Sequence, residues 1–397
     1  MLAIRASRAF DGVGLADGGV VLVIDGSKIV GLEPAGIELP DGMVVVDHPD
    51  ATILPGLIDS HVHMCGDSLD GALDRLETYE DDQLADVIEA GLKRQLAVGV
   101  TTVRDLGDRR YAVVDRRDAG NDAAYPTIVA AGPPITSVRG HCWNMGGETA
   151  GPEGLRAAVR ERVERGVDVV KIMASGGIFT PGTDVTVPQF TDEELRLVVA
   201  ETHAAGLPIT AHAHALAAVE QALSAGVDGI EHCSCMTRTG AGASPELAGR
   251  LAAAQVAVCP TLGFGSDLPP PPVLELLTRL GLTRDDLYAN VRRLHEAGVR
   301  IVGGSDAGIG NGKPHGILSQ ALIELAGCMP HAAALAAATS VAALVCGLGD
   351  RKGWLRSGYD ADVLVVDGNP LTDMADIRRV RQVVVAGITV VDRLMQT

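Results

Sequence analysis

Aromatic residues and long apolar stretches are both scarce in this sequence. Phe, Trp and Tyr together make up 3% of the 397 residues, so Ala, Val, Leu and Gly have to fill the interior. No apolar run approaches the length that spans a bilayer, and the N-terminal residues lack the apolar core of a secretory signal. These absences predict a cytoplasmic protein without a membrane partner.

Positive charge is also in deficit, because 33 Lys and Arg residues face 51 Asp and Glu residues, which gives a formal net charge of −18. This excess of negative charge argues against nucleic acid or an anionic membrane as a partner. The 7 cysteines lack the spacing of a disulfide framework, so we expect reduced thiols. A metal pair at Cys233 and Cys235 is the less favoured interpretation, because zinc pairs are usually spaced Cys-x-x-Cys.

The sequence does contain enough apolar residues for a large core, since 47% of it is hydrophobic and 21% charged. Both ends are rich in short β-type segments, namely residues 20–24, 28–31, 44–46, 362–367 and 383–391. Chain termini often lie close together, so the two ends can belong to one unit. We therefore predict a small β-sandwich domain formed by residues 1–52 and 350–397, with a larger domain inserted between them.

In the middle of the chain, apolar strand segments alternate with helical segments. Several helical segments end in Ala-Gly, and Gly suits the left-handed residue that closes a helix. With the segment that starts at residue 53, the predicted strands are 100–103, 127–130, 169–173, 208–211, 229–230, 256–259 and 300–302. Eight strands alternating with helices predict an α/β fold, a (β/α)8 TIM barrel over residues 53–349.

The first of these strands leads into two histidines. Residues 53–64 read Ile-Leu-Pro-Gly-Leu-Ile-Asp-Ser-His-Val-His-Met. Side chains two residues apart on a strand point to the same side, so His61 and His63 present two imidazoles in one direction. This arrangement is half of a site for a divalent metal ion. The alternative is a pair of surface histidines after a buried strand.

Residues that can bind a metal also mark four other strands. They are Lys171 in the fourth strand, His212 and His214 after the fifth, His232 after the sixth and Asp306 after the eighth. Each alone has an ordinary explanation, such as a hydrogen-bonded core histidine, an ion-paired lysine or a helix cap. Because active sites of such barrels lie at the C-terminal ends of the strands, we interpret the whole set as one metal site.

These motifs resemble the amidohydrolase superfamily. The resemblance rests on His-x-His after Pro-Gly-Leu-Ile-Asp, a lysine in the fourth strand, Ala-His-Ala, Glu-His and Gly-Ser-Asp. The N-terminal segment Ile-Asp-Gly-Ser-Lys-Ile-Val and the C-terminal segment Gly-Tyr-Asp-Ala-Asp-Val-Leu-Val-Val-Asp are similar to its imidazolonepropionase-related branch of Xaa-Pro dipeptidases and amidases. The resemblance covers nearly the whole chain but does not specify the substrate.

The resemblance implies two divalent metal ions, with zinc expected and Mn, Co or Fe as alternatives. The implied ligands are His61, His63 and Asp306 for the more buried ion, His212 and His232 for the more exposed ion, and a bridging, N6-carboxylated Lys171. A hydroxide shared by the ions would attack the carbonyl carbon of a C–N bond. Asp306 would take its proton as general base and pass it to the leaving nitrogen as general acid.

The loop after the third strand predicts a substrate contact, because relatives carry a Gly-His there and this sequence has His141. Its neighbours Arg139 and Trp143 differ from dipeptidase patterns, and Arg139 either binds a substrate carboxylate or is a solvated loop residue. His214 stands where some relatives have a tyrosine that touches substrate. His315 is a further candidate at the mouth of the site, with helix packing as the alternative.

The predicted function is a binuclear metal-dependent hydrolase of a C–N bond in a small molecule. Candidate substrates are dipeptides of the Xaa-Pro type, N-acyl amino acids, ureas and carbamates. The alternative is a mononuclear deaminase or cyclic-amide hydrolase, although many deaminases have Glu where this sequence has Ala215. A scaffold protein that lost its metals is disfavoured because all ligand positions are filled. Barrels of this branch often assemble, so a homo-oligomer is possible and the oligomeric state stays open.

Overall fold

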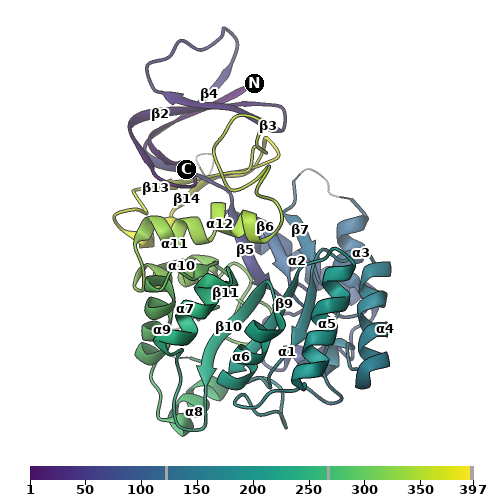
Figure 1. The fold of residues 1–397 in the computed structure, drawn as a ribbon. Coiled ribbons are helices and arrows are strands. Elements are labelled where there is room, and N and C mark those ends of the chain that lie inside the picture. The colour runs from purple at the N-terminus through teal and green to yellow at the C-terminus, as the bar shows by residue number, and fades with distance from the viewer. Residues whose placement is uncertain (121–123, 266–268, 394–397) are drawn as a thin grey trace.

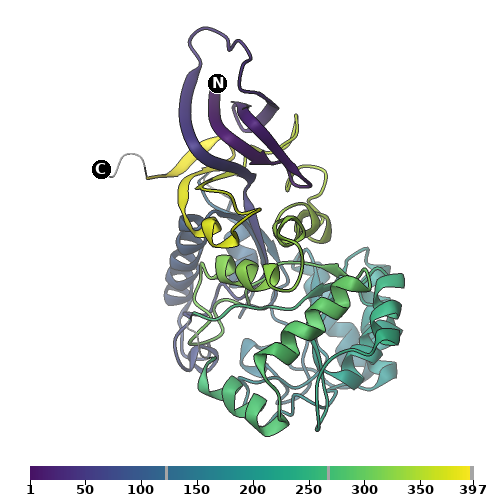
Figure 2. The ribbon, with the colours of Figure 1, turned by 90° about the vertical axis from the view of Figure 1, so that its left-hand side faces the viewer.

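The computed structural model describes residues 1–120, 124–265 and 269–393. A β-sheet built from both ends of the chain stands at one end of the molecule, and strands surrounded by helices form the rest (Figures 1 and 2). All 7 cysteines are free thiols, and only Cys346 is not fully buried. Within the described residues, no helix combines the length and the apolar character that crossing a membrane requires.

The terminal sheet has seven strands. Their spatial order is β15 (Ile388–Asp392), β14 (Val380–Val385), β13 (Val363–Asp367), β4 (Val44–Pro55), β1 (Leu2–Phe10), β2 (Leu15–Asp25) and β3 (Lys28–Pro34). β4 pairs with β1 on one side and with β13 on the other, so it joins the N-terminal and C-terminal strands. Ile4, Leu22, Ile53 and Val363 meet in one buried cluster of this sheet, which is consistent with burial of the alternate apolar positions of each strand.

The prediction that residues 53–64 begin with one continuous strand is wrong. β4 ends at Pro55 in the terminal sheet, and β5 (Leu57–Val62) starts a different sheet after Gly56. A Cβ atom on Gly56 would collide with the side chain of Thr101. Gly56 therefore allows the chain to pass directly from one sheet into the next.

The eight strand segments predicted for the middle of the chain are all present, in two parallel sheets. One sheet has the order β5, β6 (Val100–Asp105) and β7 (Thr127–Ala130); the other has the order β12 (Arg300–Ile301), β11 (Ala257–Cys259), β10 (Gly229–Met236), β9 (Ile209–Ala215) and β8 (Val170–Met173). Backbone hydrogen bonds from the segments that follow β7 and β12 link the two sheets at both edges: Ile135 N–H donates to Lys171 O over 2.8 Å, and Asp306 N–H donates to His61 O over 2.7 Å.

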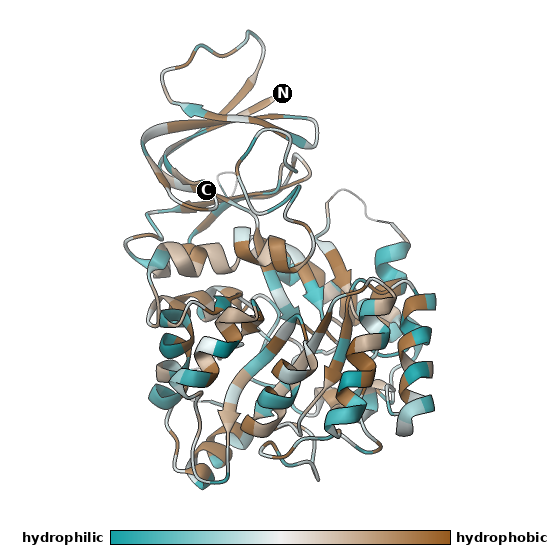
Figure 3. Cartoon of the chain, in the orientation of Figure 1, coloured by the Kyte–Doolittle hydropathy of each residue, from teal (hydrophilic) through white to brown (hydrophobic). Residues whose placement is uncertain are grey.

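Helices follow the strands and lie around them (Figure 1). They are α1 (Ala72–Arg75), α2 (Asp81–Ala97), α3 (Ala112–Asp118), α4 (Gly151–Glu164), α5 (Asp192–Ala204), α6 (Leu216–Ala225), α7 (Pro245–Ala253), α8 (Pro271–Leu280), α9 (Arg284–Glu296), α10 (Leu318–Ala326), α11 (His331–Ala337) and α12 (Ser340–Val345), with short 3-10 turns η1 (Trp143–Met145) and η2 (Met374–Arg378). These helices carry hydrophilic and hydrophobic residues side by side (Figure 3). In α5, for example, Leu195, Val198 and Val199 are buried, as expected for an amphipathic helix with one face toward the strands.

Candidate active site

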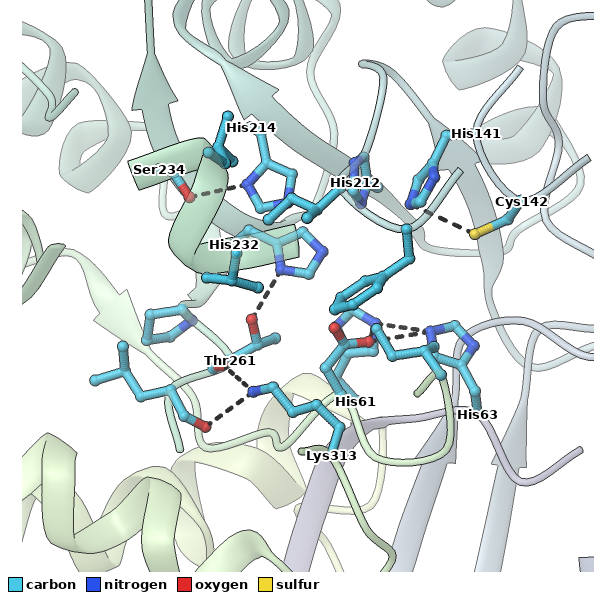
Figure 4. Close-up of a pocket in the computed structure, with 18 of the residues that line it drawn as sticks. His61, His63, His141, Cys142, His212, His214, His232, Ser234, Thr261 and Lys313 are labelled. Carbon is cyan, nitrogen blue, oxygen red and sulfur yellow. Dashed lines mark hydrogen bonds and ion pairs between the residues drawn. The ribbon is translucent and has the colours of Figure 1, made fainter. Parts of the chain in front are cut away.

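The polar residues singled out at the strand ends surround one cavity. Those that line it are His61, His63, His141, Lys171, His212, His214, His232 and Asp306, and each is less than 10% exposed. His61 and His63 lie on one side of the cavity, and His212, His214 and His232 lie on the other (Figure 4). The parallel strands thus bring together side chains that are far apart in the sequence.

On the side of the cavity that holds His61 and His63, three donor atoms form a nearly equilateral triangle. His61 Nε2 lies 3.3 Å from His63 Nε2, and Asp306 Oδ1 lies 3.4 Å from His61 Nε2 and 3.3 Å from His63 Nε2. A tetrahedral zinc ion with bonds of about 2.0–2.1 Å separates its ligands by about 3.3–3.4 Å. The His61, His63 and Asp306 cluster therefore fits a metal ion without rearrangement.

The other ring nitrogens of these histidines are fixed by acceptors. His61 Nδ1–H donates to Glu231 Oε2 over 2.8 Å, and His63 Nδ1–H donates to the Gly107 carbonyl over 2.9 Å. Glu231 also accepts from the Arg104 guanidinium over 3.1 Å. These partners fix the tautomers and leave both Nε2 lone pairs free for a metal. Burial, together with the nearby Lys171, lowers the pKa of His61 to about 4, which favours the neutral imidazole that a metal requires.

The second cluster contains His212, His214 and His232, whose candidate ligand atoms lie within 4.8 Å of one another. His232 Nδ1 is 2.8 Å from Thr261 Oγ1, which leaves its Nε2 free. His212 Nε2–H donates to the Gly176 carbonyl over 3.2 Å, which leaves its Nδ1 free. The structure brings both His212 and His214 next to His232, so either of them could complete a metal site there.

Two of these candidate ligands lie on strained backbone. His232 has φ 66° and Asp306 has φ 60°. Residues other than glycine rarely adopt this left-handed region, because the Cβ atom clashes with the backbone. Such strain persists only where the surrounding structure enforces it, and it is concentrated at functional sites.

Lys171 lines the same cavity, close to both clusters, with an unsatisfied side chain. It is 1% exposed, and its Nζ has no hydrogen-bond partner among the residues that the structure describes. Burial lowers the pKa of its amine. Because an unpaired buried ammonium is costly, this side chain is suited to a neutral amine or to a modified form that gains partners.

Of the predicted substrate residues, the structure places His141 and His214 on the cavity wall and Arg139, Trp143 and His315 outside it. The Arg139 guanidinium stacks 3.7 Å from the centre of the Trp143 ring. His315 Nε2–H donates to the Gly66 carbonyl over 2.9 Å, so it fastens the loop that follows β5. A role in substrate binding for these three residues stays a prediction.

Sequence reasoning missed two charged residues of the site, Glu231 and Lys313. Glu231 directly precedes His232 in an apolar strand, and a buried acid at such a position was the available signal. Lys313 is 3% exposed, lines the cavity and donates from Nζ to the Thr261 carbonyl over 2.7 Å. No local pattern marked Lys313, because its burial depends on the loop that holds Thr261.

Comparison with known proteins identifies the family. The model of the amidohydrolase family matches residues 52–390. Ochratoxinase of Aspergillus niger is 27% identical over 359 residues, which cover 82% of this chain and 72% of that protein. The crystal structure of an Xaa-Pro dipeptidase with methionine in its active site is 27% identical, with a TM-score of 0.84 over 98% of this chain and 99% of that chain. A prolidase complexed with N-methylphosphonate-L-proline is also 27% identical, with a TM-score of 0.84 over 99% of this chain and 100% of that chain. The chain belongs to the amidohydrolase family and is a hydrolase that acts on C–N bonds.

Proposed function

We propose that this hydrolase cleaves an amide or related C–N bond of a small molecule with the help of two divalent metal ions, zinc in the first instance. The observation that carries this proposal is the presence, in one buried cavity, of two separate groups of three donors. His61, His63 and Asp306 would hold one ion, and His212 and His232 would hold the other, with His214 near the substrate. Bound ions of this kind lower the pKa of a water molecule and polarise a carbonyl.

Lys171 would connect the two clusters after carboxylation. Its neutral amine adds to CO2 and loses one proton, which forms a carbamate with two oxygen donors. The buried position of Lys171 and its unpartnered Nζ support this step. The carbamate would carry its negative charge on two oxygens, which bound cations would stabilise, whereas an ammonium would be repelled by them.

Asp306 would move the proton during cleavage. Burial raises the pKa of its carboxyl, but His61 and His63 lower this pKa by more than burial raises it. The pKa of Asp306 therefore lies below its usual range. The carboxylate is therefore available as the general base that takes a proton from the attacking water. It can then deliver this proton to the leaving nitrogen as general acid. His141, 4.4 Å from His212 between ring centres, would orient the substrate carbonyl.

The fold supports the same arrangement. We propose that the two parallel sheets are parts of one (β/α)8 barrel over residues 53–349, because hydrogen bonds join them at both edges. Residues 1–52 and 350–397 would form the β-sandwich domain. We propose that the protein acts on a small-molecule substrate in the cytoplasm and has no nucleic acid or membrane partner. A homo-oligomer is one of the assembly states that remain open.

A mixed substrate library tests this function. The protein, loaded with zinc in the presence of bicarbonate, is incubated with Xaa-Pro dipeptides, N-acyl amino acids, ureas, carbamates and aminated heterocycles, and masses and ammonia are measured together. Similarity to an Xaa-Pro dipeptidase and a prolidase favours the dipeptides in this set. We expect a new amine paired with a new acid. Ammonia from the heterocycles alone would favour a mononuclear deaminase instead.

The variant Lys171→Ala separates the metal site from the fold. We expect it to retain its structure, to bind fewer than two zinc ions per chain and to lose hydrolysis by at least about 100-fold, because the link between the clusters is gone. Metal content is measured by elemental analysis, and folding by circular dichroism. Full activity of Lys171→Ala would contradict the binuclear proposal.

A further inference from the structure

Beyond the metal-binding residues, most residues that line the cavity are apolar. They include Phe179, Phe264, Val273, Leu276, Leu277 and Ile309, which we call the apolar wall. The chain has only 4 Phe residues, and two of them line this cavity. Since aromatic residues are otherwise so scarce, their position beside the site points to contact with an apolar ligand rather than to ordinary core filling.

Helix α8 supplies one side of this wall. Val273, Leu276 and Leu277 are buried and lie at helical spacings of three and four residues, so they share one face. The same three residues line the cavity. Leu274, beside this face, is 45% exposed. α8 therefore presents an apolar face to the space above the metal-binding residues.

The wall offers little to an ionic group. Apart from Lys171 and Asp306, the only Asp, Glu, Lys or Arg among the described residues that line the cavity is Lys313. Lys313 Nζ donates to the carbonyls of Thr261 and Leu262 and lies 4.6 Å from the centre of the Phe264 ring. Its charge is thus already solvated by the protein, and no guanidinium is present among these residues to clamp a carboxylate in the bidentate manner.

We infer that the substrate carries a bulky apolar group, aryl or branched alkyl, next to the scissile C–N bond, and that α8 with Phe179 and Phe264 binds this group. The inference rests on the proposed hydrolase function and narrows its substrate class. A small zwitterionic dipeptide would leave the apolar wall in contact with water, whereas an aryl amide, urea or carbamate would displace that water. The apolar wall is therefore the element that selects the substrate.

The test uses a paired library. Each amide, urea and carbamate is present once with a methyl group and once with a 2-naphthyl group at the same position, and kcat/KM is measured for the zinc-loaded protein. We expect at least about a 100-fold preference for the naphthyl member of any hydrolysed pair, because even one methylene in an apolar pocket changes kcat/KM by about 10-fold or more. A methyl member that is cleaved as well as its naphthyl partner would overturn the inference and leave the hydrolase function intact.

Two variants of the same helix assign the selectivity to the wall. Leu277→Asp should lower kcat/KM for the naphthyl substrate at least about 30-fold and reduce the naphthyl-to-methyl ratio of kcat/KM, because it places a carboxylate in the apolar space. Leu274→Asp, on the exposed side of α8, is the matched control and should change neither substrate. Phe179→Ala, in a half-buried loop, is the second variant in case Leu277→Asp does not fold, and we expect it to reduce the naphthyl-to-methyl ratio of kcat/KM about tenfold.

A binding measurement decides the inference even if nothing in the library is hydrolysed. N-phenyl-1-naphthylamine, a neutral fluorescent probe, should bind the wild-type protein and the Leu274→Asp variant equally and bind Leu277→Asp or Phe179→Ala at least about tenfold more weakly. No hydrolysis together with this binding pattern would reject the proposed function but keep the apolar site. Equal binding to all variants, or no binding at all, would overturn the inference.

Discussion

Glu231 orients the ring of His61, a candidate metal ligand. It accepts a hydrogen bond from His61 Nδ1 and pairs with the buried Arg104. Burial raises the pKa of Glu231, but His61 and Arg104 lower this pKa by more than burial raises it. The pKa therefore lies below its usual range, and the residue stays anionic. An anionic partner makes the imidazole a stronger ligand and fixes its ring.

The first prediction concerns this partner. Glu231→Gln can still accept the hydrogen bond but loses the charge, so we expect zinc affinity at the His61 cluster to fall by about 10–100-fold. Affinity is measured by competition with a chromogenic chelator. Glu220→Gln, an exposed glutamate of α6, is the control. Unchanged affinity in Glu231→Gln would show that the charge is dispensable.

The second prediction concerns pH and Asp108. Burial, together with the neighbouring Asp105, raises the pKa of Asp108 above its usual range. The folded protein therefore keeps a proton that the unfolded chain releases above about pH 4. With more protons bound in the folded state, the free energy of unfolding falls as pH rises through this range. Denaturant unfolding at several pH values should show that the free energy of unfolding of Asp108→Asn falls less with rising pH than that of the wild-type protein. Asp86→Asn, at an exposed position, is the control.

At the residue scale, the sequence was informative where chemistry follows a strand. The alternation of a strand places His61 and His63 on one side, and polar residues at the ends of apolar runs are conspicuous, so these positions could be singled out. Arg139 and Trp143 could not be placed in this way, because their stacking depends on the local fold of a loop. The burial of Lys313 likewise depends on a distant loop that provides its acceptors.

At the scale of elements, α5 shows how a helix start is encoded locally. Thr191 Oγ1 accepts from the Glu194 N–H over 3.2 Å, and the Glu194 carboxylate accepts from the Thr191 N–H over 3.0 Å. This capping box satisfies two N–H groups that the first turn leaves unpaired. Leu195 follows directly and is buried, so the cap also fixes where the apolar face begins.

The third prediction tests this cap. Thr191→Ala removes the side-chain acceptor and should lower the free energy of unfolding by about 1 kcal/mol. Thr191→Ser keeps the hydroxyl and should retain most of the stability. Both are measured by urea denaturation at neutral pH. An equal loss in the serine variant would mean that the threonine methyl group, not the cap, is responsible.

The strand elements were predictable because each apolar run is bounded by turn residues and helical segments. The break at Gly56 was not, since an apolar run reads the same whether it serves one sheet or two. Only the collision between a Cβ atom at position 56 and Thr101, a contact made across the fold, reveals it. The inward face of α8 is visible as a periodic pattern, but its position over the cavity depends on tertiary packing.

At the scale of the whole molecule, the terminal sheet and the parallel strands share one core. Leu364 and Val383 from the terminal sheet belong to the same buried cluster as Leu57, Leu96 and Val100 from the inserted segment. Removing the C-terminal strands would expose this apolar surface to water, at roughly 25 cal/mol for each Å². The two parts of the chain therefore depend on each other for stability.

The fourth prediction follows from this shared core. Residues 53–349, expressed alone, should be aggregated or only partly folded, because the surface that Leu364 and Val383 cover is exposed. Size-exclusion chromatography and limited proteolysis would detect this, with the full chain as control. A monodisperse fragment that unfolds cooperatively would show instead that this segment is an independent domain.

The pairing of β4 with β13 also means that one edge of β4 stays unpaired while the rest of the chain is synthesised. The β4 edge at residues 51–55 is made early, but its partner from Val363 onward emerges about 300 residues later. At ribosomal speeds of about 5–20 residues per second, this edge waits for roughly 15 to 60 s. An unpaired apolar strand is a template for association with other chains. Production of this protein should therefore benefit from chaperones that shield nascent chains or from slower initiation, which lowers the number of waiting edges in the cell.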